Sequence, residues 1–140
     1  MSRVFWDTNV FIYLFEGSGK PAARAAELRD RILFRKDAFL TSTLTLGEVL
    51  VKPLETGNEE LRRKYESVLF QETVLIPFTD EAAILYARIR RDRSLKAPDA
   101  IQLACAAMAG VDIFITNDER LSQKNIPGIQ FIASLHRAFL

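Results

Sequence analysis

The sequence has little of the chemistry on which many small proteins depend. A single cysteine, Cys105, excludes an intrachain disulfide and is typical of a reducing compartment, so we expect a cytoplasmic protein. The apolar neighbours of Cys105 predict a small core residue rather than a nucleophile. The only histidine, His136, lies near the chain end, where a surface position is expected. Catalysis by a pair of histidines or by a Ser-His-Asp triad is therefore disfavoured.

The chain also lacks a strong net charge and a secretory leader pattern. Its formal net charge is +1, so any attraction to nucleic acid would depend on local basic patches. A short apolar stretch follows Arg3, but no small-residue cleavage site comes after it and Asp7 would interrupt its core. We therefore expect neither secretion nor a membrane partner.

What remains is the composition of one globular domain. Apolar residues make up 49% and charged residues 26% of 140 residues, enough to bury about two thirds of the unfolded surface. We expect a single domain over residues 1–140. Apolar runs that are typical of buried strands occur at residues 3–6, 38–42, 74–78, 111–116 and 129–133.

Helical patterns alternate with these strands. They are expected after Asp7, from Pro21, over residues 43–55 with a kink or an end at Pro53, from about Asn58, after Thr79, from Pro98 to Gly110, and as a short helix at the chain end. Strands that alternate with helices form a parallel sheet through right-handed crossovers. The predicted fold class is α/β, a three-layer α/β/α sandwich with a sheet of roughly five parallel strands.

Four acidic residues are placed at one edge of this expected sheet. Asp7 follows the first strand, Asp118 follows the strand at 111–116, and Glu48 and Asp99 lie near the starts of helices. Ligands of such folds bind outside the carboxyl ends of the strands, which is where these four residues are expected. Asp112 begins a strand at the opposite edge, so a structural role is expected for it.

Each acid also has a purely structural interpretation. Asp7 and Asp118 could be N-caps, Asp99 could stabilise its helix through the dipole, and Glu48 could form a capping box with Thr45. Caps and dipole contacts of this kind contribute about 0.5 to 2 kcal/mol each.

The apolar surroundings of Asp7 and Asp99 favour a further role, because a buried carboxylate must be paired, hydrogen-bonded or metal-bound. The nearest basic residues to Asp7 in sequence, Arg3 and Lys20, have no obvious route to it. Oxygen ligands without histidine suit Mg²⁺ or Mn²⁺ rather than zinc.

Four motifs extend this interpretation: VFWDTNVFI, STLTLGEVL, KAPDAIQLACAA and IFITNDERL, which occur in this order along the chain. With them the chain resembles PIN-domain ribonucleases, most closely the VapC-type toxins of type II toxin–antitoxin systems. The resemblance implies an intact catalytic and metal-binding quartet with polar supporting residues. The quartet is Asp7, Glu48, Asp99 and Asp118, and the supporting residues are Thr8, Asn9, Thr116 and Asn117. Gln102 departs from the pattern, since many relatives have an apolar residue there.

The resemblance implies a metal-dependent endoribonuclease that hydrolyses RNA phosphodiester bonds with one or two Mg²⁺ or Mn²⁺ ions. It also implies products with a 5′-phosphate and a 3′-hydroxyl, a cognate antitoxin as partner, and a homodimer. The basic segment RIRRDRSLK leads to Asp99, and its Arg90, Arg91 and Arg93 are candidate substrate contacts. Basic residues also stabilise helix C-termini and stay solvated, which is the competing interpretation.

Two other functions stay open at this point. A non-toxin or non-catalytic PIN-like module could bind RNA or a protein partner with the same motifs. A phosphoacceptor domain of the receiver type would share the α/β alternation, but no lysine follows the last strand pair, where that chemistry would need a phosphate contact.

Overall fold

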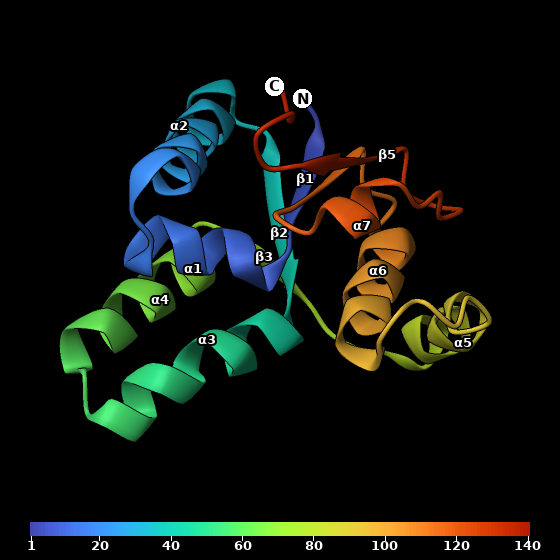
Figure 1. The fold of residues 1–140 in the computed structure, drawn as a ribbon, viewed down its shortest axis with the longest axis horizontal. Helices are drawn as coiled ribbons and strands as arrows, with labels where there is room; N and C mark the ends of the chain where they lie inside the picture. The colour runs from blue at the N-terminus through green and yellow to red at the C-terminus, as the bar shows by residue number, and fades with distance from the viewer.

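The computed structural model describes residues 1–140 and contains one sheet of five parallel strands in the order β3-β2-β1-β4-β5. The strands are β1 (Arg3–Trp6), β2 (Ala38–Ser42), β3 (Val74–Ile76), β4 (Ile113–Thr116) and β5 (Phe131–Ser134). The predicted α/β/α architecture is confirmed, because helices cover both faces of this sheet (Figure 1). The helices are α1 (Thr8–Glu16), α2 (Gly19–Arg35), α3 (Thr43–Thr56), α4 (Glu59–Gln71), α5 (Asp80–Ile89), α6 (Ala97–Ala109) and α7 (Glu119–Ser122).

The central strands are apolar on both faces, as a covered parallel sheet requires. Trp6 and Phe39 point to the side of α1–α4, where their rings lie 4.9 Å apart, centroid to centroid. Phe5 and Phe114 point to the side of α5 and α6 and stack with their centroids 5.1 Å apart. Two apolar cores, one on each face, therefore hold the sheet in place.

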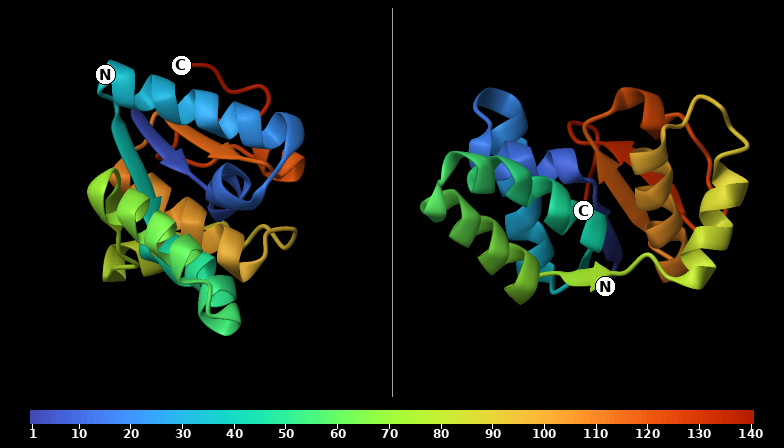
Figure 2. Two further views of the ribbon diagram at one scale, coloured as in Figure 1. Left: turned by 90° about the vertical axis from the view of Figure 1, so that its left-hand side faces the viewer. Right: turned by 90° about the horizontal axis from the view of Figure 1, so that it is seen from below.

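Helices α3 and α4 pack against each other and extend away from the sheet (Figure 2). The sequence predicts that helix α3 kinks or ends at Pro53. An end there is wrong, because α3 continues past Pro53 to Thr56. The end is set by Gly57, whose positive φ of 67° lets its amide bond back to the Pro53 carbonyl.

Several predicted boundaries differ from the structure. The short helix expected at the chain end was wrong: the chain makes a single turn there, in which the amides of Arg137 and Ala138 bond to the Ser134 carbonyl. Four residues give too few internal hydrogen bonds for helix formation to be favourable. The polar segment after β4 contains the short helix α7, and the strands expected at 74–78, 111–116 and 129–133 are shorter. No helix has the length and apolar character needed to span a membrane.

The order of the strands determines where a ligand can bind. From β1 the chain moves outward through β2 to β3, and then returns to the other side of β1 to form β4 and β5. The direction of winding therefore reverses between β1 and β4, and in such sheets the crevice outside the carboxyl ends at this point is the usual binding site. Asp7 follows β1 and Asp118 follows β4, so both lie at that crevice.

Candidate functional site

Asp7 is the most deeply buried of the four acids. Its backbone amide donates to the Ile115 carbonyl at 2.9 Å, which fixes it beside the end of β4. One carboxylate oxygen accepts the Thr8 amide at 2.8 Å and caps α1, and the other accepts the Thr116 hydroxyl at 2.8 Å. The residue is 6% exposed, and it forms no ion pair with a basic residue.

The pKa of Asp7 is raised by this environment to about 6. Burial is the main cause, because it penalises the charged form, and the charges of Asp99 and Glu48 raise the pKa further. The hydrogen bonds from Thr116 and Thr8 act in the opposite direction. Asp7 is therefore a buried carboxylate whose negative charge is hydrogen-bonded but not neutralised.

Glu48 and Asp99 approach Asp7 from two different helices. Glu48, on α3, is exposed and accepts the Thr8 hydroxyl at 2.7 Å. Asp99, in the first turn of α6, is half-buried, and its pKa is raised by burial and by the charges of Asp118 and Glu48, while Arg120 and Lys96 lower it. The fold thus brings together acids that are 92 residues apart in sequence.

Asp118 differs from the other three because it has a cation of its own. Its side chain caps α7 by accepting the Arg120 amide at 2.9 Å, and the Arg120 guanidinium lies 3.0 Å from its other oxygen. Arg120 holds the pKa of Asp118 below its usual range. Three of the four predicted acids therefore lack an ion-pair partner, and only Asp118 has one.

The donor chemistry of this group fits a hard divalent cation. All four candidate ligands are carboxylates without histidine or cysteine, and the buried Asp7 has no other source of positive charge. The side chains as they stand do not form a group of three or more metal-ligating residues. A bound ion would therefore need side-chain rotations, which the exposed Glu48 and the half-buried Asp118 can make more readily than the buried Asp7.

The predicted supporting residues connect the acids. The Thr116 hydroxyl, which donates to Asp7, also accepts the Asp118 amide at 3.0 Å. Asn9 donates to the same hydroxyl at 3.4 Å and accepts the Asn117 amide at 3.0 Å. The ends of β1 and β4 are thereby tied together around Asp7.

Sequence reasoning did not predict the role of Gln102. This residue is 1% exposed; its amide donates to the Thr8 hydroxyl at 2.9 Å and to the Thr45 hydroxyl at 2.8 Å, and its carbonyl accepts the Ser42 hydroxyl. Since Thr8 donates to Glu48, one chain of hydrogen bonds leads from α6 to the acid on α3. A single amide in a helix that is apolar nearly all round must find partners, and that signal was available in the sequence.

Two of the four acids also have the structural role that the sequence predicts for them. Asp7 and Asp118 are N-caps as well as members of the acidic group. The capping box of Thr45 with Glu48 was wrong, because Ser42 caps α3 and Glu48 bonds to Thr8 instead. Tertiary contacts with α1 explain the difference.

Residues expected outside the site also lie outside it. Asp112, at the opposite edge of the sheet, accepts the Arg3 amide at 2.7 Å. His136 is exposed and lies 3.2 Å from Glu119. Cys105 is buried, and burial raises the pKa of its thiol to about 11.

The three arginines predicted to contact substrate lie where α5 ends and in the turn that follows it. Arg90 donates to the Tyr86 hydroxyl at 2.8 Å and lies over its ring, while Arg91 and Arg93 are exposed.

Comparison with known proteins identifies the class to which this fold and site belong. The model of the PIN domain family matches residues 4–127, and the chain belongs to that family. No curated protein matches the sequence.

Several solved structures from toxin–antitoxin systems share the fold. A VapBC complex from Rickettsia felis bound to a promoter DNA fragment gives a TM-score of 0.74 at 12% identity, over 94% of this chain and 97% of the other. A toxin–antitoxin complex from Klebsiella pneumoniae gives a TM-score of 0.64 at 26% identity, over 90% of this chain and 94% of the other. A DNA-bound VapBC complex from Salmonella typhimurium gives a TM-score of 0.68 at 20% identity, over 96% of this chain and 99% of the other. The predicted resemblance to PIN domains is confirmed by the family model, and the fold is shared with VapBC complexes.

Proposed function

We propose that this protein is a metal-dependent endoribonuclease and the toxin of a toxin–antitoxin pair. The observation that carries the proposal is the buried Asp7, which has no cation of its own and lies at the winding reversal of the sheet with three further acids around it. PIN domains are generally nucleases, and membership of that family supports hydrolysis of a phosphodiester. An acidic group repels a phosphodiester, so this site needs bound cations to act on one.

Asp7 and Asp99 are the proposed principal ligands of Mg²⁺ or Mn²⁺, with Glu48 and Asp118 as further ligands or as groups that orient water. When bound, such ions lower the pKa of water and stabilise charge on the attacking and leaving oxygens. The Thr116 hydroxyl holds one oxygen of Asp7, and the Thr8 hydroxyl holds Glu48. In-line attack of water gives products with a 5′-phosphate and a 3′-hydroxyl.

The proposed toxin role is supported by the solved structures that share this fold. The similar structure from Klebsiella pneumoniae is a toxin–antitoxin complex, and the one from Mycobacterium tuberculosis is a member of the VapBC family of toxin–antitoxin systems. We propose that a cognate antitoxin covers the acidic site of this chain. We also propose that the toxin is a homodimer.

Arg90, Arg91 and Arg93 are proposed to contact RNA phosphates beside the cleaved bond. None of the three forms an ion pair with a carboxylate within the chain, and each therefore keeps its charge available to a polyanion.

The test is cleavage of a cellular RNA pool by the purified protein with Mg²⁺ or Mn²⁺, compared with EDTA and with the Asp99→Asn variant. We expect cleavage only with metal, no cleavage by the variant, and 5′-phosphate ends. Ends with a 2′,3′-cyclic phosphate would contradict the mechanism, because they require attack by the 2′-hydroxyl of the RNA. Absence of cleavage by folded, inhibitor-free protein would favour a non-catalytic PIN-like module that binds RNA or a protein.

A further inference from the structure

The arginines of this chain differ in their partners, and seven of the thirteen form no ion pair. Six of them form ion pairs with carboxylates: Arg24, Arg29, Arg31, Arg35, Arg62 and Arg120. The four arginines between residues 88 and 93 form none, although the chain has 18 acidic residues. Their contacts are a carbonyl and a tyrosine, neither of which neutralises charge. This segment is therefore a concentrated positive charge that the fold itself leaves unbalanced.

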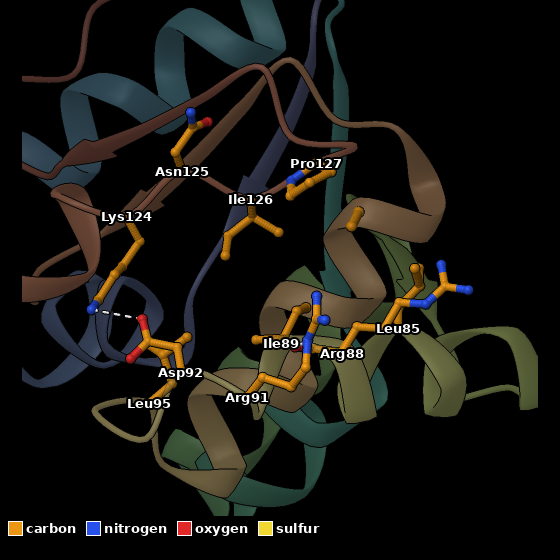
Figure 3. Close-up of a pocket in the computed structure, with 11 residues that line it drawn as sticks. Leu85, Arg88, Ile89, Arg91, Asp92, Leu95, Lys124, Asn125, Ile126 and Pro127 are labelled. Carbon is orange, nitrogen blue, oxygen red and sulfur yellow. Dashed lines mark hydrogen bonds and ion pairs between the residues drawn. The ribbon is translucent and has the colours of Figure 1, made fainter.

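Two of these arginines border a hollow of about 600 Å³ between α5 and the segment after α7 (Figure 3). Arg88 and Arg91 come from the α5 side, and Lys124 lies on the opposite side. The apolar part of the lining includes Ile89, which is half-buried, and Ile126, which is buried. The rest of the lining is mostly charged or polar, so the hollow suits a ligand that has both an apolar part and a charged group.

The charge of the hollow is positive even after its one acid is considered. Asp92 also lines it, and the Lys124 ammonium lies 2.8 Å from its carboxylate. That pair cancels, and Lys124 is held further by the Ser94 hydroxyl at 2.6 Å. The unbalanced charges that remain are those of Arg88 and Arg91, which suit an anionic group.

The hollow lies next to the acidic site. A smaller hollow of about 370 Å³ is lined by Asp99 and Arg120, and it shares Leu95 and Lys124 with the larger one. A chain that places a phosphodiester at Asp99 can therefore place its next unit in the larger hollow. These shared lining residues favour an occupant that belongs to the substrate of the acidic site.

We propose that the hollow between Arg88, Arg91 and Lys124 binds the nucleotide of the RNA strand that neighbours the cleaved bond. Its phosphate contacts Arg88 and Arg91, and its ribose and base cover the apolar lining around Ile89 and Ile126. The inference rests on the proposed function, since it assigns a subsite to that same substrate. It adds Arg88 to the proposed RNA contacts and places Arg91 in the hollow, whereas Arg90 and Arg93 lie outside it.

The test compares two double variants with the same loss of charge. Arg88→Gln with Arg91→Gln alters the hollow. Arg63→Gln with Arg137→Gln removes two arginines that have no ion pair and lie elsewhere. Binding of a short, fluorescently labelled single-stranded RNA is measured by anisotropy in EDTA, so that no cleavage occurs. Melting temperatures identify any variant that is less stable.

We expect the first double variant to bind RNA roughly 10-fold more weakly and the slope of log affinity against log salt to fall by about 0.7, the value for the one phosphate that both arginines contact. The control variant should stay close to the wild type. Competition gives a second readout: a nucleoside monophosphate should displace RNA from the wild type at a lower concentration than inorganic phosphate does, and this preference should be lost in the first double variant.

Equal effects of the two double variants, equal competition by phosphate and nucleotide, or no RNA binding by the wild type would each overturn the inference. Its failure is distinguishable from failure of the proposed function, because cleavage with Mg²⁺ or Mn²⁺ is measured separately. RNA binding that depends on the hollow, without any cleavage, would support the subsite and contradict the nuclease. Cleavage with equal binding by both variants would do the reverse.

Discussion

Two buried aspartates at opposite ends of the sheet differ in whether a cation neutralises their charge. Asp37 precedes β2 at the amino end and is 9% exposed; it accepts the Ser2 amide at 2.8 Å, and the Arg35 guanidinium lies 3.2 Å from its other oxygen. Asp7, at the carboxyl end, is 6% exposed and has two hydrogen bonds but no cation. The charge of Asp37 is therefore paired with a cation within the chain, and the charge of Asp7 is not.

The difference shows that helix capping does not explain Asp7. Asparagine or serine caps a helix about as well without a buried charge. A rise in pKa from 3.8 to about 6 corresponds to about 3 kcal/mol against the ionised form at neutral pH. The ionised carboxylate of Asp7 therefore destabilises the folded protein when no cation is bound. A bound cation would remove this cost.

The largest expected effect is on RNA cleavage, and it should differ between variants at the carboxyl end and at the amino end of the sheet. Asp99→Asn should reduce metal-dependent RNA cleavage at least about 10³-fold, because it removes a proposed metal ligand at the carboxyl end. Asp112→Asn, at the amino end, should leave cleavage within about 2-fold, since Asp112 only accepts the Arg3 amide. Cleavage rates at saturating Mn²⁺ measure both. Equal loss in both variants would remove the functional distinction between the two ends.

The next largest effect is on stability. The folded-state pKa of Asp7 is raised, so its contribution to stability is fully present below pH 4 and is lost as the pH rises to about 6. In EDTA, Asp7→Asn should therefore become more stable relative to the wild type as the pH rises, by up to about 3 kcal/mol.

The matched change Asp37→Asn should instead destabilise the protein at pH 7, because Arg35 then loses its partner. Urea unfolding between pH 4 and pH 8 measures both effects. A difference between Asp7→Asn and the wild type that does not change with pH would contradict an uncompensated charge on Asp7.

A smaller effect concerns the hydrogen bonds beneath the acids. Gln102→Leu leaves the hydroxyls of Ser42, Thr8 and Thr45 without one partner each, which should destabilise the fold by about 1 to 3 kcal/mol. Because Thr8 also holds Glu48, the Mg²⁺ concentration for half-maximal cleavage should rise roughly 10-fold. A loss of stability with an unchanged Mg²⁺ requirement would assign Gln102 to the core alone.

The same comparison explains how much the sequence could predict. Strand ends are local features, so the positions of Asp7 and Asp118 at one edge followed from alternation and burial alone. Asp112 could be assigned to the opposite edge for the same reason. The fold class rested on the same regular pattern and was confirmed.

What could not be predicted depends on contacts between distant segments. Gln102 bonds to residues 60 and 94 positions away, and no local pattern indicates such partners. The hollow at Arg88 joins α5 to Lys124 across the fold, so the sequence indicated the basic segment but not which arginines line a cavity. The chain end is a turn because its residues dock against the rest of the protein, and four residues carry little intrinsic preference.

The smallest expected effect concerns the one acid at the carboxyl end that has a cation. Arg120 is exposed, and exposed ion pairs contribute little, so Arg120→Gln should change the free energy of unfolding by less than about 0.5 kcal/mol. The same guanidinium competes with a metal ion for Asp118, whose pKa it lowers, and its charge also acts on Asp99. Removing it should lower the Mg²⁺ concentration for half-maximal cleavage by about 3-fold. An unchanged or higher requirement would mean that Arg120 assists the site, and the imbalance of charge would then lie with Asp7, Glu48 and Asp99 alone.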